Sequence, residues 1–249
     1  RYSTGGNYED GDGNNVAGTA ADLASFVGKG GYETLAGHRV ELNGQYIKDN
    51  DDRPFRANIG DIDGVVNPLV REYELERHTF SVNYNNTQAF GLLDPEVTIG
   101  YSQSKLEVPE PFGSKGETGS FSGKAENDFN LSPVDVITLG VDFYSDQAKY
   151  NDPDYDVDEK AHNVGLYSQV RLAPLDDLRL SFGGRADQQW FDGIDGSDQS
   201  NAGLSGNVSV VYDLFDHLTL NAGYSNVFGG IALGENFILN PDWQYDDID

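Results

Sequence analysis

The stretch Leu178-Arg-Leu-Ser-Phe-Gly-Gly-Arg-Ala-Asp187 alternates apolar and polar side chains with a period of two. In a β-strand this period places its leucines and Phe182 on one face, and its arginines and Asp187 on the other. The same pattern returns in residues 202–212 and 218–227. The sequence therefore predicts amphipathic strands, each with an apolar and a polar face.

The connections between these segments alternate in length. Short links are predicted at residues 35–37, 130–134, 173–177 and 213–217, and long polar links at residues 49–73, 107–117, 151–159 and 190–201. Short turns at one end and long loops at the other are typical of a transmembrane β-barrel, whose apolar face meets lipid and whose polar face meets the lumen. We expect the short links to lie at the periplasmic end.

Residues 118–129 support a barrel over a soluble sandwich. Their polar face would carry Ser120, Ser122, Lys124, Glu126 and Asp128, which is too polar for a soluble core and suits a wet lumen. We therefore expect an all-β, antiparallel up-and-down transmembrane barrel. About ten strands of roughly 10–13 residues are predicted, a length that crosses the bilayer at the usual tilt.

Composition narrows the possible functions. The chain carries 16 Lys plus Arg against 42 Asp plus Glu, a net charge of -26, which excludes nucleic acid as a partner. No apolar run approaches the roughly 18 residues of a membrane helix. Cysteine is absent, so disulfides, thiolate metal sites and cysteine nucleophiles are excluded. Methionine is absent too, which indicates a mature product or an internal fragment.

Several segments, in order and spacing, resemble the TonB-dependent outer-membrane receptors. The strand-like ones are Asn163-Val-Gly-Leu-Tyr-Ser-Gln169, the 178–187 stretch, Val208-Ser-Val-Val-Tyr212 and Leu218-Thr-Leu-Asn-Ala-Gly-Tyr-Ser225. Val227-Phe228, Leu233-Gly-Glu235 and Asn240-Pro-Asp242 resemble the Phe-Arg-Ala-Pro and Asn-Pro-x-Leu boxes of the siderophore and haem branch. The chain departs from these boxes at Gly229, Gly230, Ile231 and Trp243.

The resemblance implies a bacterial outer-membrane receptor, in contact with outer-membrane lipid. Residues 1–249 would form part of one barrel domain, from the middle to the late strands of a larger, roughly 22-strand barrel. The N-terminal plug domain, through which such receptors contact the TonB complex, and the closing C-terminal strand would lie outside the chain. The implied function is capture and TonB-driven import of an iron chelate, a ferric siderophore, and not an enzymatic reaction.

Other functions stay open at this point. One alternative is a receptor of the same family whose ligand is haem, cobalamin or a glycan. Alternatives outside the family are a complete small barrel, such as an adhesin or protease, and a secreted glycan-binding β-protein. No histidine lies between Phe228 and Asp242, where the haem branch often supplies one, and this favours a siderophore over haem.

Aromatic and arginine side chains in the predicted loops are the candidate ligand contacts, because an iron chelate presents aromatic faces together with anionic oxygens. The alternative for the aromatic residues is anchoring at the membrane interface. The candidates are Arg53, Phe55, Arg56, Trp190, Phe191, Trp243 and Tyr245.

No catalytic constellation and no cofactor site is predicted. The four histidines, His38, His78, His162 and His217, are scattered over strand ends and faces, so we interpret them as solvated or interfacial. The acids Asp152, Asp154, Asp156 and Asp158 are weak calcium candidates, since such charge runs are usually only solvated. No metal site is therefore predicted.

Overall fold

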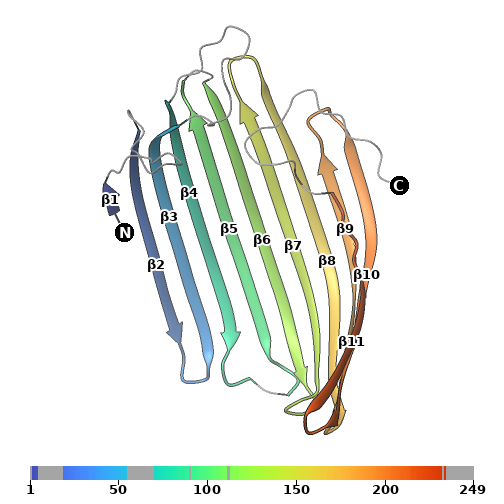
Figure 1. The fold of residues 1–249 in the computed structure, drawn as a ribbon. Coiled ribbons are helices and arrows are strands. Elements are labelled where there is room, and N and C mark those ends of the chain that lie inside the picture. The colour runs from blue at the N-terminus through green and yellow to red at the C-terminus, as the bar shows by residue number, and fades with distance from the viewer. Residues whose placement is uncertain are drawn as a thin grey trace.

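The computed structural model describes residues 2–4, 19–54, 70–89, 91–110, 113–231 and 233. They form one antiparallel sheet in which the strand order follows the chain order (Figure 1). The strands are β1 (Tyr2–Thr4), β2 (Ala20–Glu33), β3 (His38–Pro54), β4 (Val70–Asn86), β5 (Pro95–Val108), β6 (Ser114–Asn130), β7 (Val136–Asn151), β8 (Asp156–Leu175), β9 (Leu178–Asp192), β10 (Asp198–Phe215) and β11 (Leu218–Asn226). Beyond the short β1 there are ten long strands, as the alternation predicts.

The sheet has an apolar outer face and no soluble core beneath it. Val141 of β7 lies opposite Ala125 of β6 and Leu166 of β8, so apolar side chains form continuous rows across the strands. These side chains stay accessible: Leu166 is 66% exposed. A sheet that leaves such rows uncovered suits contact with lipid.

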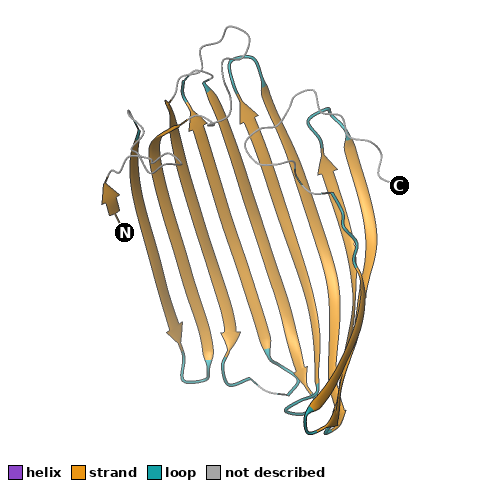
Figure 2. Cartoon of the chain, in the orientation of Figure 1, coloured by secondary structure: helices purple, strands orange, loops and turns teal. Residues whose placement is uncertain are grey.

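The turns meet at one end of the sheet, here the turn end (Figure 2). Hydrogen bonds from the turns extend to neighbouring hairpins there: the Thr87 N–H donates to the Gly37 carbonyl, and the Asp213 N–H of β10 donates to the Asp177 carbonyl. The sheet connections at this end are residues 34–37, 87–94, 131–135, 176–177 and 216–217, and the opposite end is here the loop end. The predicted grouping of the short links is confirmed.

The strands are longer, and most loops shorter, than the sequence predicts. At the loop end the connections shrink to residues 109–113, 152–155 and 193–197, and the two longer links are residues 5–19 and 55–69. The predicted lengths are wrong because Asp, Asn and Ser near this end favour loops, whereas antiparallel pairing continues through them. Pairing satisfies the backbone whatever the side chains are.

The outer face changes character toward the loop end. Above the apolar rows, Lys48, Glu76, Lys105, Glu117, Lys149 and Asp158 are successive cross-strand partners from β3 to β8. This row of alternating charge, here the charge ladder, is incompatible with hydrocarbon. The loop-end part of the sheet therefore projects beyond the apolar layer.

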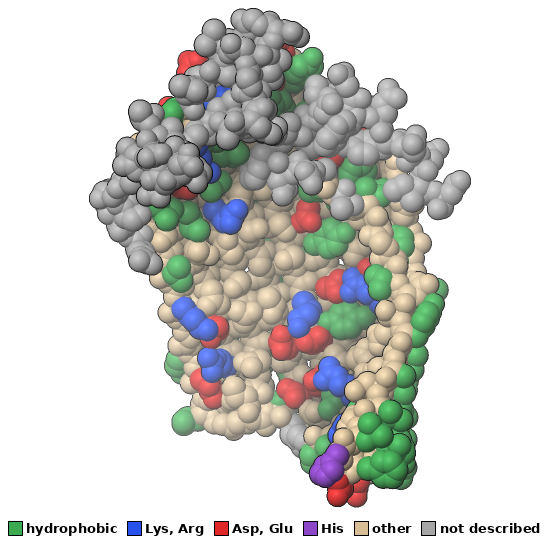
Figure 3. All heavy atoms as spheres, in the orientation of Figure 1, with side chains coloured by type: hydrophobic (Ala, Val, Ile, Leu, Met, Phe, Trp, Pro, Cys, Tyr) green, Lys and Arg blue, Asp and Glu red, His purple; other side chains and the backbone are tan. Residues whose placement is uncertain are grey.

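The inner face is mostly polar, although Ala148, Ala161 and Phe191 are buried on it near the loop end. Figure 3 shows basic and acidic side chains next to one another on this face. Among the ion pairs of the inner face, Lys29 pairs with Glu41 and Lys124 with Glu126. The described part of the chain includes no helix long and apolar enough to span a membrane.

Candidate functional site

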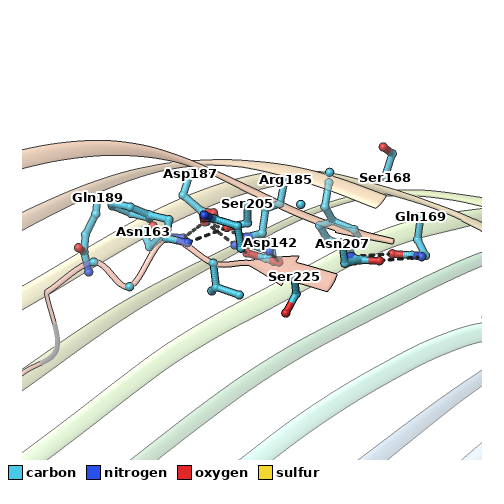
Figure 4. A pocket seen from close by; sticks show the side chains of 18 of the residues that line it. Asp142, Asn163, Ser168, Gln169, Arg185, Asp187, Gln189, Ser205, Asn207 and Ser225 are labelled. Carbon is cyan, nitrogen blue, oxygen red and sulfur yellow. Dashed lines mark hydrogen bonds and ion pairs between the residues drawn. The ribbon is translucent and has the colours of Figure 1, made fainter. Parts of the chain in front are cut away.

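A cavity of about 540 Å³ lies on the inner face, against strands β7 to β11. It is lined largely by polar side chains, and residues 227–230, which follow β11, close one side of it. Its polar lining residues from the strands include Asp142, Tyr144, Asn163, Tyr167, Gln169, Arg185, Asp187, Gln189, Ser205 and Asn207 (Figure 4).

Arg185 organises the charged part of this cavity. Its guanidinium makes a bidentate contact with Asp142 of β7, with Nη2 2.7 Å from Oδ1, and its Nε donates to Asp187 at 2.8 Å. Asn163 donates to the same Asp187 carboxylate at 2.9 Å. The guanidinium fits because Gly165 stands opposite on β8, where a Cβ would overlap it. Two carboxylates on one cation leave this wall with a net charge of about -1.

The network continues across the inner wall toward β5. Arg185 lies over the ring of Tyr167, 5.8 Å from its centroid, and the Tyr167 hydroxyl donates to Glu126 at 2.7 Å. Lys124 pairs with Glu126 at 2.6 Å and with Glu96 at 3.1 Å. Each charged group thus has an opposite partner, which fixes the wall and leaves it wettable. Such an arrangement suits passage or binding of a polar solute.

Residues 227–231, here the strap, leave the sheet and cross the inner face. β11 ends at Asn226, opposite Gly206, although β10 continues to Asp198. The Phe228 N–H donates to Ser205 Oγ at 3.0 Å. The Phe228 ring occupies the space left by Gly203, since a Cβ there would overlap it.

Gln189 fastens the far end of the strap. Its Oε1 accepts the Ile231 N–H at 2.6 Å, while its Nε2 donates to the Ile231 carbonyl at 2.7 Å and to the Tyr144 hydroxyl at 3.0 Å. Gln189 is only 2% exposed. The amide side chain therefore replaces, for Ile231, the pair of backbone hydrogen bonds that a neighbouring strand would supply.

Arg53, predicted as a ligand contact, lies at the loop end of β3 on the inner face. Its guanidinium pairs with Asp51 at 2.7 Å and Asp49 at 2.9 Å, and lies 5.7 Å from the ring centroid of Tyr73. Three strands, β4 to β6, separate β3 from β7, the first strand that lines the cavity, so the structure does not bring Arg53 to it. Its ligand role stays a prediction.

The adjacent residues Trp190 and Phe191 point to opposite faces. Trp190 lies opposite His162 on the outer face and is 42% exposed, whereas Phe191 is on the inner face and 1% exposed. The position of Trp190 suits the alternative of interfacial anchoring, because it lies above the apolar rows. The remaining candidates, Phe55, Arg56, Trp243 and Tyr245, lie outside the described residues.

The weak calcium candidates do not come together. Asp156 and Asp158 belong to β8, while Asp152 and Asp154 lie in the preceding turn. Partial burial raises the pKa of Asp152, but hydrogen bonds from the Asp154 N–H, the Tyr150 hydroxyl and the Tyr155 N–H outweigh it and hold the pKa below its ordinary value. Among the described residues no group of three or more His, Cys, Asp or Glu side chains is placed to hold a metal ion.

Sequence reasoning missed most of the cavity. The alternation puts Arg185 and Asp187 on the polar face, yet neither was singled out. Asp142 is a lone acid between Val141 and Phe143, and its contact with Arg185 spans 43 positions of the chain. Only the register of β7, β8 and β9 brings them together.

A single sheet with an apolar outer face and a polar inner wall is the wall of a membrane β-barrel. A family model, described as "TonB dependent receptor-like, beta-barrel", matches residues 1–245. The chain belongs to this family, whose members are proteins of the bacterial outer membrane.

Similar proteins of known name are transporters and receptors, not enzymes. The chain is 29% identical to "Heme transporter BhuA" of Brucella ovis over 253 residues, which cover 94% of this chain and 36% of that protein. It is 29% identical to the "Ferripyoverdine receptor" of Pseudomonas aeruginosa over 51% of this chain and 17% of that protein. The chain thus spans about a third of the length of the first of these relatives.

Solved structures share the fold. The FrpB iron transporter of Neisseria meningitidis superposes with a TM-score of 0.71 at 14% identity, covering 89% of this chain and 39% of that one. The copper transporter OprC gives 0.70 at 16% identity, covering 90% and 39%. The predicted barrel, unclosed in a chain of this length, is confirmed.

Proposed function

We propose that the parent protein imports an iron compound across the outer membrane with energy supplied through TonB. The observation that carries the proposal is the similarity to a haem transporter over 94% of this chain. The paired charges of the inner wall support it, because they provide a wettable surface for a polar solute. We expect the plug domain of the family to make the contact with TonB.

Haem is the first candidate ligand on this similarity, and a ferric siderophore is the second. The siderophore is supported by the similarity to the ferripyoverdine receptor over 51% of the chain. It is also supported by charge: 42 acids against 16 bases favour a neutral or cationic chelate over haem, which carries two propionates.

The test is growth of a strain that lacks its own iron receptors and expresses the full-length protein. Haemin or ferric desferrioxamine B, a cationic hydroxamate, serves as the single iron source, and a tonB deletion is the control. Growth on either compound that requires TonB supports the proposal and identifies the ligand class. Failure on both, with the protein inserted in the membrane, contradicts iron import and leaves cobalamin or glycans as ligands to be tried.

A further inference from the structure

We propose that the cavity on the inner wall is a solute-binding site gated by the strap, and that Gln189 is the positioning residue that holds the gate closed. The inference rests on the proposed import function. It assigns to residues 227–231 a movement that opens the cavity of about 540 Å³ between Arg185, Asn207 and the strap.

The strap is held in a way that permits release. It lies outside the strand ladder, so its docking depends on two hydrogen bonds to Gln189, one to Ser205 and the seat of Phe228 at Gly203. Gly229 and Gly230 lie between the two anchor points, and Gly230 has a φ of +61°, which a residue with a side chain rarely adopts. Segments with few contacts of this kind open at low cost compared with the sheet.

The groups beneath the strap determine what the cavity accepts. Arg185 spends its donors on Asp142 and Asp187, and Asn163 also binds Asp187, so the wall carries more acceptor than donor capacity. Asn207 donates to Gln169 at 3.2 Å between β10 and β8, and Gln169 Nε2 also donates to Ser181 at 2.7 Å. The site therefore suits a solute with hydrogen-bond donors or a positive charge.

A disulfide across the strap tests the gate in the full-length receptor. An ideal Cβ at Gly203 would lie 2.7 Å from the Cβ of Phe228, so a shift of about 1 Å brings G203C and F228C to disulfide geometry. The described chain has no cysteine of its own to interfere. We expect oxidation to lower uptake of the compound that the wild type transports by about tenfold, and reduction to restore it.

The outcomes separate this inference from the proposed function. Equal uptake by the oxidised and reduced forms overturns the gate, and so does failure of the disulfide to form in an inserted barrel. If the wild type transports neither haemin nor ferric desferrioxamine B, the proposed function fails. Formation of the disulfide between G203C and F228C then still tests whether the strap lies against β10.

The adjacent residue Gln188 provides a matched control for Gln189. Gln188 is on the outer face, where it donates to Ser200 and to the Asn201 carbonyl, and it does not contact the strap. In an F228C background, Gln189→Leu should speed thiol labelling by about tenfold, while Gln188→Leu should leave it unchanged. Gln189→Glu, which keeps the acceptor for the Ile231 N–H, should fall between them. The same labelling rate in all three variants contradicts the role of Gln189.

Discussion

At the residue scale, the described arginines all lie on the inner face, whereas the lysines occupy both faces, with Lys29 and Lys124 on the inner one. The register places the described arginines on the inner face: Arg39, Arg53, Arg71, Arg77, Arg171, Arg179 and Arg185. Five lysines are on the outer face: Lys48, Lys105, Lys115, Lys149 and Lys160. Arginine suits the inner wall because its planar fork binds carboxylates bidentately. Lysine suits the outer face because its stem lies on apolar surface while its ammonium reaches water.

Leu166 tests the assignment of the faces. It lies in the apolar rows between Val141 and Ala186. Leu166→Arg should cost about 2–4 kcal/mol of folding free energy in the full-length barrel, the value for a charge on the lipid face near mid-bilayer. Ser181→Arg, on the inner face of β9, is the control and should cost far less. Reversible denaturant unfolding in lipid vesicles measures both. Equal costs would contradict the assignment of the faces, and a larger cost for Ser181→Arg would reverse it.

Asp135, at the turn end, should make the stability of the barrel depend on pH in the acidic range. Its carboxylate accepts the Ala173 N–H at 2.8 Å and the Ser132 hydroxyl at 2.8 Å. The Ala173 hydrogen bond, followed by that of Ser132, holds the pKa of Asp135 below its ordinary value. The stabilisation is therefore complete above the unfolded value of about 3.9 and is lost as pH falls through the lower folded pKa.

The measurement is thermal unfolding of the refolded full-length barrel along an acid titration. Asp135→Asn should lower the melting temperature at neutral pH and flatten its decline in acid. Asp176, at the neighbouring turn, is the site of the control substitution Asp176→Asn. A wild type and an Asp135→Asn variant with the same acid profile would exclude this role for Asp135.

At the element scale, hairpins alternate between a turn end and a loop end, and this alternation sets the orientation. The apolar turn residues mark the turn end: Leu35 is fully exposed at 101%, and Leu92, Leu93 and Phe215 are exposed as well. Exposed apolar tips beside the outer apolar rows suit insertion at the membrane boundary. The charge ladder lies toward the other end.

Single cysteines test this orientation in intact cells. We expect Asp195→Cys, in the connection between β9 and β10, to react with a membrane-impermeant thiol reagent. Leu35→Cys, in the turn between β2 and β3, should react only after the outer membrane is opened. Labelling at residue 35 without labelling at residue 195 would invert the topology.

The charge ladder should stabilise the register of the strands that it joins. Lys105 lies directly between Glu76 and Glu117, and it also pairs with Glu107 on its own strand. Lys105→Glu gathers four acids and should destabilise the barrel, since cross-strand pairs contribute about 0.2–1 kcal/mol each. Adding Glu117→Lys should recover part of the loss. A double-mutant cycle on unfolding free energies measures the coupling, and additive effects would contradict the ladder.

At the scale of the whole molecule, the sheet is a curved wall (Figure 1) whose inner face supports the site and whose apolar outer face suits contact with lipid. One of the two longest loop-end links joins β3 to β4, where Pro54 lies opposite Val70. Because these strands are paired up to the link, the link can be exchanged without disturbing the sheet. A variant with a different link therefore tests the role of residues 55–69 without changing the sheet.

Replacing residues 55–69 with a short Asn-Gly turn tests the loop that contains Phe55 and Arg56. We expect the barrel to insert and uptake of the transported iron compound to fall by about tenfold, if the loop captures the ligand. Resistance of the folded barrel to heat in a gel is the control for insertion. Unchanged uptake would remove Phe55 and Arg56 as contacts.

The sequence alone determined which side chains share a face, because a strand alternates with a fixed period of two. The alternation alone places Leu180 and Phe182 on one face, and Arg185 and Asp187 on the other. It also determined the sites of the tight turns, and through ordered motifs the family. Strand ends were misjudged because backbone pairing continues wherever two strands remain in register, whatever the local side chains prefer.

Only the tertiary structure decided which residues meet. The Asp142 contact of Arg185 depends on the register of three strands, which a period of two leaves undetermined. The strap depends on the side-chain amide of Gln189, which binds the backbone of Ile231, a residue 42 positions further along the chain. The local sequence pattern determines which face of the sheet a residue occupies. The contacts of the site arise from long-range strand pairing, so the site forms only when the sheet is assembled.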